Sequence, residues 1–275
     1  MCDYLDEICR SRLKTNFKKG LRNLSLEIRI ILVEPMYQGN VGSVARAMKN
    51  FGYTDLVLVN PCKLEGEARA MSSHARDVLE GAKITSTLDE AVKGANLTIG
   101  TTGVASLKTG EHIRLPLYTL KELKEKLKDC SGTIAILFGR EDAGFRNDEL
   151  KSFDMLVTVP TSEIYPIMNL SHAVAVVLYE LSELEGGNSP LADGFDLQLL
   201  YEHLDELLEE IEYPPHKKDK TSLMLRRILG RAGLTPREVQ TLRGIIRKIE
   251  RKMGYAIKDS DDQKLKTPES MEKFI

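Results

Sequence analysis

The sequence lacks long apolar runs, clustered cysteines and a strong net charge, and each absence excludes a class of protein. No apolar run approaches the roughly 18–20 residues that span a bilayer, and the charged N-terminus has no apolar stretch typical of a secretory signal. The four cysteines show no C-x-x-C spacing, which argues against structural zinc and a disulfide framework. A net charge of −2 excludes a uniformly basic nucleic-acid coat. We expect a cytoplasmic globular protein with no membrane and no metal.

Charge is distributed unevenly along the 275 residues. Residues 180–213 hold 11 acids and no Lys or Arg, whereas residues 214–253 hold 12 bases against three acids, a net charge of +9. Residues 1–25 are also basic, with a net charge of +3. Two interpretations stay open: either the acidic and basic blocks attract one another within or between subunits, or the basic block binds phosphate.

Short apolar runs alternate with amphipathic stretches from about residue 28 to residue 180. Runs that are apolar on both faces and separated by helices are typical of a parallel sheet covered on both sides, so the predicted fold class is α/β. We expect strands at 28–33, 56–59, near 84, at 97–100, 133–138 and 155–159, and helices at 40–51, 65–81, 88–92, 119–127 and 170–184.

The sequence Gly-Gly-Asn-Ser-Pro at 186–190 is the clearest linker signal in the chain. Only helical patterns follow it, at 195–211, 222–229 and 236–253. The predicted organisation is a basic N-terminal extension, an α/β domain, a linker and a helical C-terminal extension, with boundaries at 1–25, 26–186, 187–194 and 195–275.

Ligands of open parallel sheets bind at the carboxyl ends of the strands, so the strand exits carry the candidate site. Asn40 and Arg46 follow the first strand, where small residues before a helix let backbone N–H groups approach an anion. This exit is neither a P-loop nor a dinucleotide fingerprint, because no Gly-Lys-Ser/Thr and no G-x-G-x-x-G is present. A nicotinamide dehydrogenase is therefore disfavoured.

Three further exits carry small or polar residues. They are Gly100–Gly103 after the fourth strand, Phe138–Phe145 after the fifth and Pro160–His172 after the sixth. A Glu at a strand end, such as Glu141, needs a donor partner, and Asn169 is placed to cap the long helix that follows. Four such exits on one sheet edge predict a cofactor crevice.

At these same exits the sequence resembles a known family. NVGSVARAMKNFG, LFGREDAGF and PIMNLSHAVAVVLYEL are similar to motifs 1, 2 and 3 of the SPOUT class of RNA methyltransferases, TrmH/SpoU branch, over about residues 28–185. The helical extension, with MLRRILGRAGLTPREVQTLRGIIRKI, resembles that of the TrmJ subfamily, whose members methylate the 2′-hydroxyl of the anticodon-loop nucleotide numbered thirty-two in tRNA. The motif around Tyr165 resembles archaeal members.

The resemblance implies a C-terminal trefoil knot whose loops bind S-adenosylmethionine, and an obligate homodimer with the site completed across the interface. On this basis the cofactor-binding residues are Thr101, Thr102, Gly103, Gly139, Val159, Ile167 and Met168. TrmH-type enzymes have a polar residue two positions before the motif 3 asparagine, where this chain has Ile167. We therefore expect no side-chain hydrogen bond to the ligand from that position.

The resemblance also assigns the catalytic residues Arg46, Asn40, Glu141 and Asn169. Methyl transfer to a ribose hydroxyl needs in-line approach and removal of one proton, and it needs no metal. The family proposal makes Arg46 the general base, but a guanidinium rarely gives up its proton. Arg46 is equally suited to holding a phosphate and stabilising a developing alkoxide. His172, inside an apolar helix, is expected to pack rather than to react.

The predicted function is therefore S-adenosylmethionine-dependent 2′-O-methylation of tRNA, on cytidine or on uridine. The basic block then becomes a hypothetical tRNA clamp with contacts at Arg226, Arg227, Arg231, Arg243 and Arg247. Two alternatives stay open: methylation of a ribosomal RNA ribose, and a catalytically silent RNA-binding scaffold. The presence of all four catalytic residues argues against the scaffold.

Overall fold

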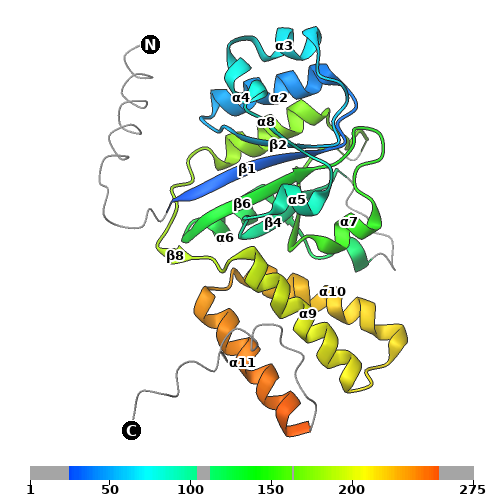
Figure 1. Cartoon of the computed structure of the whole chain (residues 1–275). Coiled ribbons are helices and arrows are strands. Elements are labelled where there is room, and N and C mark those ends of the chain that lie inside the picture. Colours follow the sequence, from blue (N-terminus) through cyan, green and yellow to red (C-terminus); the bar gives the residue numbers. More distant parts are fainter. Residues whose placement is uncertain (1–24, 104–111, 163, 254–275) are drawn as a thin grey trace, which may run out of the picture.

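The computed structural model describes residues 25–103, 112–162 and 164–253. Its centre is a parallel sheet in the order β3-β2-β1-β6-β4-β7-β5, with β8 paired to the start of β6 (Figure 1). The strands are β1 (Leu26–Val33), β2 (Asp55–Val59), β3 (Lys83–Thr85), β4 (Leu97–Thr101), β5 (Leu117–Thr119), β6 (Cys130–Phe138), β7 (Met155–Thr158) and β8 (Ser189–Pro190). The predicted α/β class is confirmed, and the trefoil knot stays a prediction.

Helices cover both faces of this sheet. They are α2 (Gln38–Asn50), α3 (Gly66–Ser72), α4 (Arg76–Glu80), α5 (Leu88–Val92), α6 (Leu120–Leu127), α7 (Asn147–Ser152) and α8 (Leu170–Leu181), with 3-10 turns at Ser73–Ala75 and His112–Arg114. The single helix predicted over 65–81 is wrong: the 3-10 turn separates α3 from α4, and Ser73 has a φ of 51°.

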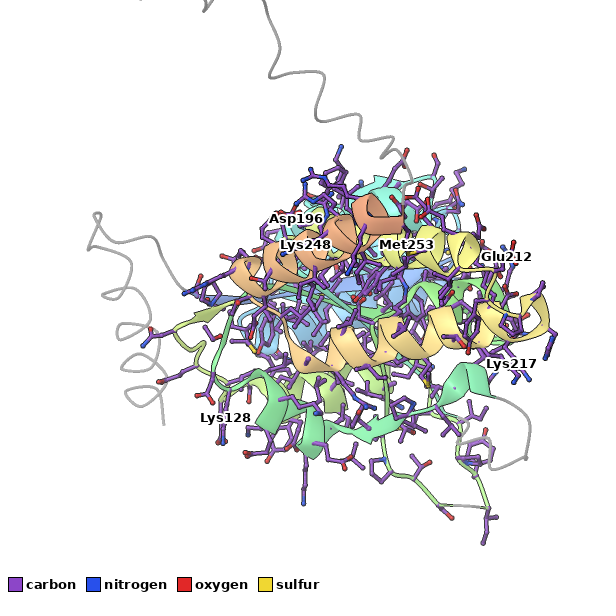
Figure 2. The ribbon with its side chains drawn as sticks, turned by 90° about the horizontal axis from the view of Figure 1, so that it is seen from below. Lys128, Asp196, Glu212, Lys217, Lys248 and Met253 are labelled. Carbon is purple, nitrogen blue, oxygen red and sulfur yellow. The ribbon has the colours of Figure 1, made fainter. Side chains whose placement is uncertain are left out.

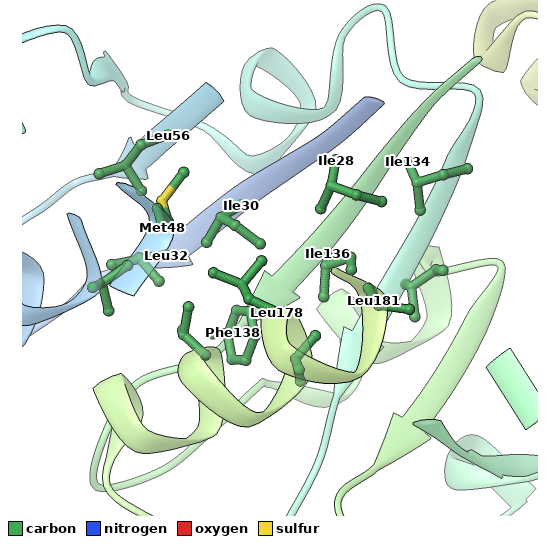
Figure 3. Packing of buried hydrophobic residues seen from close by; sticks show 14 of the residues in the cluster. Ile28, Ile30, Leu32, Met48, Leu56, Ile134, Ile136, Phe138, Leu178 and Leu181 are labelled. Carbon is green, nitrogen blue, oxygen red and sulfur yellow. The ribbon is translucent and has the colours of Figure 1, made fainter. Parts of the chain in front are cut away.

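The alternation of side chains along β1 divides the core into two layers. Ile28, Ile30 and Leu32 face α2, α6 and α8, whereas Ile31 and Val33 face the opposite side with α5 and α7. Successive residues of a strand point to opposite faces, so a central strand must be apolar throughout. Figure 3 shows the first layer, where Met48 of α2 and Leu178 of α8 pack onto Ile30 and its neighbours.

Three helices follow the sheet: α9 (Gly194–Glu210), α10 (Pro215–Ala232) and α11 (Pro236–Met253). They form a separate layer, on the side of the molecule away from α2, α3 and α4 (Figure 1). The segment predicted as a linker is packed against the sheet, because a Cβ on Gly187 would lie 2.3 Å from the backbone of Asp129. The predicted basic N-terminal extension lies outside the described residues, apart from Ser25.

None of the helices in the described part of the chain has the length and apolar character of a membrane span. Within the same residues, no group of three or more His, Cys, Asp or Glu side chains is placed to hold a metal ion.

Candidate active site at the carboxyl edge of the sheet

A pocket of about 280 Å³ opens where β4, β6 and β7 end. All seven residues predicted to bind the cofactor line it: Thr101, Thr102, Gly103, Gly139, Val159, Ile167 and Met168. The volume lies near the lower limit of about 300 Å³ for small-molecule pockets. Sequence positions up to 67 residues apart therefore meet at one site.

Backbone hydrogen bonds hold the first loop of this pocket in place. The Thr102 N–H donates to the Val157 carbonyl at 2.9 Å, and the Thr101 hydroxyl donates to the Leu137 carbonyl at 2.9 Å. Both interactions tie the end of β4 to neighbouring strands. The loop is therefore set before any ligand binds, which reduces the ordering cost of binding.

The pocket's chemistry fits S-adenosylmethionine. Apolar side chains at Val159, Ile167 and Met168 offer a surface for a flat ring, and the carboxylates of Glu141 and Asp142 line the same pocket and attract a cationic ligand. As expected for Ile167, no side-chain hydrogen bond is available at that position.

Close backbone approach shapes the second loop. A Cβ on Gly139 would lie 2.5 Å from the carbonyl carbon of Gly144, and Arg140 and Gly144 exchange two backbone hydrogen bonds of 3.2 and 2.9 Å. Only glycine fits such a contact at position 139. The loop is thus a tight hairpin that carries Glu141 at its turn.

Glu141 fixes the loop between β1 and α2. Its carboxylate accepts hydrogen bonds from the backbone N–H groups of Met36 at 2.9 Å and Tyr37 at 3.4 Å, and from the Asn40 side-chain amide at 3.0 Å. Three donors occupy most of the acceptor capacity of a carboxylate. Glu141 is therefore a positioning residue that aligns motif 1 with motif 2.

Asn169 extends this chain of hydrogen bonds to the third motif. Its amide donates to the Asn40 side-chain oxygen at 3.0 Å, while its own oxygen caps α8 by accepting from the Ser171 N–H at 2.9 Å. Each asparagine is thereby held in one orientation. His172, one residue further along, is exposed, so the packing expected for it is not found within the described residues.

Arg46 does not join this cluster. It lies six residues after Asn40 on α2, a rotation of about 240° around the helix axis, and its side chain is exposed. Within the described residues no hydrogen bond or ion pair is formed by its guanidinium. The structure thus brings together three of the four predicted catalytic residues and leaves the fourth on an open helix face.

A partly buried ion-pair network beside the pocket was not predicted from the sequence. Arg140 binds Glu149 through two hydrogen bonds of 3.0 and 2.8 Å and Glu34 through contacts of 2.8 and 2.7 Å. The hydrogen bond from Arg140 holds the pKa of Glu34 below its usual value, and both carboxylates raise the pKa of Arg140. Arg140 itself was the sign of this network in the sequence, because it is a charged residue two positions after an apolar strand.

Two of the predicted RNA-binding arginines stabilise the contact between the helical layer and the sheet. Arg226 stacks on the Tyr201 ring at 4.1 Å and donates to the Ser152 carbonyl at 3.1 Å. Arg227 is only 2% exposed and donates to the Leu150 carbonyl at 2.6 Å. Burial lowers the pKa of Arg227 to about 10.

Within the helical layer, Arg243 is 9% exposed and Arg247 is half-buried. The structure thus places Arg227 and Arg243 in the interior and engages Arg226 within the fold, while the phosphate contacts predicted for all five arginines stay a prediction. Arg231 remains exposed. Figure 2 looks onto this layer and shows Lys248 on α11 and Lys217 on α10.

Comparison with known proteins agrees with the motifs. The model of the SpoU rRNA methylase family matches residues 27–179, and that of the TrmJ tRNA methyltransferase C-terminal domain matches residues 195–258. The chain is 42% identical to the tRNA (cytidine-2′-O-)-methyltransferase TrmJ of Methanocaldococcus jannaschii, over 78% of this chain and 96% of that protein.

Bacterial relatives are also similar. The tRNA (cytidine/uridine/adenosine-2′-O-)-methyltransferase TrmJ of Pseudomonas aeruginosa is 33% identical over 86% of this chain and 98% of its own length. Among solved structures, TrmJ from Z. mobilis superposes with a TM-score of 0.65 at 31% identity, covering 81% of this chain and 98% of that one.

Proposed function

Because this chain belongs to the SpoU methylase family and carries a TrmJ C-terminal domain, we propose that it transfers a methyl group from S-adenosylmethionine to a ribose 2′-hydroxyl of tRNA. The target is a pyrimidine nucleoside, at the anticodon-loop position numbered thirty-two. The hydrogen-bonded chain from Glu141 through Asn40 to Asn169 carries the proposal, because it joins all three family motifs beside the cofactor pocket.

The bound cofactor supplies an electrophilic methyl group on a sulfonium, and the protein supplies position and proton handling. The pocket lined by Thr101, Gly139 and Met168 holds the donor at the edge of the sheet. Asn40 and Asn169, each locked by its neighbours, orient the acceptor ribose for in-line approach. Glu141 acts through Asn40 and through the loop that precedes it.

Arg46 completes the site from the partner subunit of a homodimer. The α8 face that carries Val176, 36% exposed, and Tyr179, 69% exposed, is apolar and largely open, with the Phe51 ring edge-on to Tyr179. An exposed apolar face on a helix whose other side packs into the core is typical of a protein–protein interface. Burying it against a second copy would bring the exposed guanidinium of α2 toward the partner's pocket, where it would hold a phosphate and stabilise the developing alkoxide.

The tRNA backbone is held by bases that remain exposed on the helical layer. They are Arg231, Arg237, Lys248, Arg251 and Lys252. Arg231 is also among the tRNA contacts predicted from the sequence, and the other four lie on the same layer. The protein would act in the cytoplasm, where tRNA substrates are found.

The test is methyl transfer from labelled S-adenosylmethionine to bulk tRNA, followed by nucleoside analysis. Labelled 2′-O-methylcytidine or 2′-O-methyluridine mapped to the anticodon loop supports the proposal. Label only in ribosomal RNA would keep the site and overturn the tRNA assignment. Cofactor binding without transfer to any RNA would favour the silent scaffold.

The Arg46 assignment is tested with Arg46→Ala. We expect a loss of kcat/KM of at least about 100-fold with unchanged S-adenosylmethionine binding, since Arg46 does not line the pocket. Mixing this variant with Glu141→Ala tests the dimer, because a heterodimer would contain one site with both residues intact. Absence of any activity in the mixture would contradict completion across the interface.

A further inference from the structure

The helical layer touches the sheet domain at two segments that contribute to the cofactor pocket. Arg227 of α10, only 2% exposed, donates its Nη2 group to the Leu150 carbonyl at 2.6 Å and, over a longer 3.5 Å, to the Ile113 carbonyl. We propose that Arg227 is a positioning residue for S-adenosylmethionine, which holds two walls of the pocket in place from the helical layer. The inference rests on the proposed function, since it takes S-adenosylmethionine as the ligand of that pocket.

The first wall is α7, a helix of six residues that lies next to α10 (Figure 1). Leu150 of α7 lines the pocket, and Glu149 holds Arg140, another lining residue, through two hydrogen bonds of 3.0 and 2.8 Å. A helix this short has little stability of its own, because its nucleation is unfavourable and few hydrogen bonds follow. The position of this wall therefore depends on contacts from other elements.

Two consecutive arginines of α10 supply such contacts at the C-terminus of α7. The last four carbonyls of a helix lack partners within it. Arg227 donates to the Leu150 carbonyl, and Arg226 donates to the Ser152 carbonyl at 3.1 Å. Positive charge at a helix C-terminus also interacts favourably with the helix dipole. The helical layer thus caps a helix of the sheet domain.

The second wall is the 3-10 turn His112–Arg114, which precedes β5. Arg114 lines the pocket, while the neighbouring Ile113 packs against the core layer that contains Leu150. The turn and α7 are in contact, and the single Arg227 guanidinium reaches a carbonyl of each. A change at Arg227 therefore acts on both walls at once.

Stability alone does not explain an arginine at position 227. Within the described residues, its Nε and Nη1 atoms are buried without a hydrogen-bond partner, and burial lowers the pKa of the guanidinium to about 10. Asp154 opposes this shift, but its carboxylate already accepts from the Tyr201 hydroxyl at 3.0 Å and lies 3.7 Å from Arg226. Unpaired buried donors and a desolvated charge cost free energy that an apolar side chain of similar length avoids. The two carbonyl contacts at the pocket give the reason for this residue.

The experiment measures S-adenosylmethionine binding to the full-length protein by calorimetry, in the wild type and in Arg227→Met. Methionine is unbranched and a good helix former, so the change removes the guanidinium with little disturbance of α10. We expect the Kd for S-adenosylmethionine to rise by about tenfold, because small misplacements of a site's contacts are costly. Steady-state kinetics should show the same rise in KM for S-adenosylmethionine and an unchanged KM for tRNA.

Two further variants separate positioning from stability. Tyr201→Phe also removes a buried hydrogen bond between the helical layer and the sheet, but neither Tyr201 nor its partner Asp154 lines the pocket. This variant should leave the Kd for S-adenosylmethionine unchanged. Arg227→Lys keeps the charge but offers a point donor in place of the planar fork, so its Kd should lie between those of the wild type and Arg227→Met. Thermal unfolding of every variant checks that the fold is intact.

A wild-type Kd in Arg227→Met, or an equal rise in Arg227→Met and Tyr201→Phe, would overturn the inference while leaving the proposed function intact. Weaker tRNA binding with unchanged S-adenosylmethionine binding would make Arg227 an RNA contact and overturn it as well. If Arg227→Met does not fold, Arg227→Lys carries the test, and a wild-type Kd there overturns the inference. A wild-type protein that binds no S-adenosylmethionine would overturn the proposed function and this inference together.

Discussion

The Arg140 guanidinium, 9% exposed, lies between the carboxylates of Glu34, 32% exposed, and Glu149, 11% exposed. Removing the charged partner of a partly buried carboxylate costs about 1–3 kcal/mol. We expect Arg140→Met to lower the free energy of unfolding by that amount, because Glu34 and Glu149 lose their main charged partner and keep their contacts with Arg146. Urea unfolding followed by circular dichroism measures it.

The control for Arg140→Met is Lys128→Met, which breaks an exposed pair with Glu125 at 2.9 Å. Exposed pairs contribute about 0–1 kcal/mol, so this variant should change stability very little. An equal effect in both variants would show that the Arg140 network carries no special stability.

The stability of this network should also depend on pH through Glu34. The hydrogen bond from Arg140 lowers the pKa of Glu34 in the folded protein below its ordinary value of 4.5. A carboxyl group with a lowered pKa contributes stability above its unfolded pKa, and this contribution is lost as pH falls from about 4.5 through the folded value.

The matching variant is Glu34→Gln, which keeps the shape of the side chain and removes its charge. We expect the free energy of unfolding of the wild type to exceed that of the variant by about 1–2 kcal/mol at pH 7. This difference should shrink below about pH 4.5. Urea midpoints across pH 3–7 would show this. A difference that stays constant over the whole range would mean that Glu34 acts through packing alone.

Single residues were predicted well where a motif identified them and poorly where tertiary contacts decide. The cofactor residues all line one pocket, because they lie at the ends of strands that the apolar runs located or in the loops that follow them. The burial of Arg227, which was predicted as an RNA contact, was not foreseen, since a basic block gives no direct sign of burial. Its position between Leu223 and Gly230, both buried, continues a helical stripe that predicts an inward-facing side chain.

Helix α10 meets the sheet at Gly230. A Cβ there would lie 2.6 Å from the Cβ of Asp154 and 2.9 Å from its carbonyl oxygen. Asp154 is itself held, because it accepts from the Thr98 hydroxyl at 2.7 Å and from the Tyr201 hydroxyl at 3.0 Å. The helix can approach β7 this closely only with glycine at position 230.

We expect Gly230→Ala to force α10 away from β7 and to destabilise the protein by about 1–3 kcal/mol. Gly244→Ala is the matched control, since nothing lies within 4 Å of its added Cβ on α11. Alanine is the better helix former by about 0.5–1 kcal/mol, so the control should stabilise. Thermal unfolding measures both, and destabilisation of equal size in the two variants would contradict the close packing at Gly230.

Element prediction succeeded for long, periodic segments and failed for short ones. The strands at the centre of the sheet and α8 were expected from their apolar sequences. β5 was missed because three residues at a sheet edge give no periodic signal, and α7 was missed because six mostly polar residues resemble a loop. The predicted start of α10 at 222 was late, since the charged first turns after Pro215 carry no apolar stripe.

Of the two interpretations of the charge blocks, attraction between them is seen in one ion pair, and phosphate binding by the basic block stays a prediction. Lys218 at the start of α10 pairs with Glu209 at the end of α9, so the acidic and basic blocks do attract one another within the subunit. The bases exposed further along, on α10 and α11, remain free to bind phosphate. Sequence could not divide the basic block in this way, because the division depends on which side of each helix meets α9.

This division makes a prediction about tRNA binding. Neutralising Arg231, Arg237, Lys248 and Arg251 to Gln should weaken binding of all tRNAs alike, because phosphate contacts carry no sequence information. Each lost contact should also reduce the salt dependence, with the slope of log K against log salt concentration falling by about 0.7–0.9 per residue. Filter binding or fluorescence anisotropy at several salt concentrations measures both effects.

The control neutralises four exposed bases elsewhere, Arg76, Lys83, Lys121 and Lys128, so that net charge falls equally without touching the helical layer. If α10 and α11 form the tRNA surface, the slope changes only in the first variant, because counterions are released only where phosphates are neutralised. Equal changes in both variants would indicate a general effect of net charge. A change only in the control would place the RNA against the sheet domain, and the helical layer would then serve the sheet domain alone, through Arg226 and Arg227.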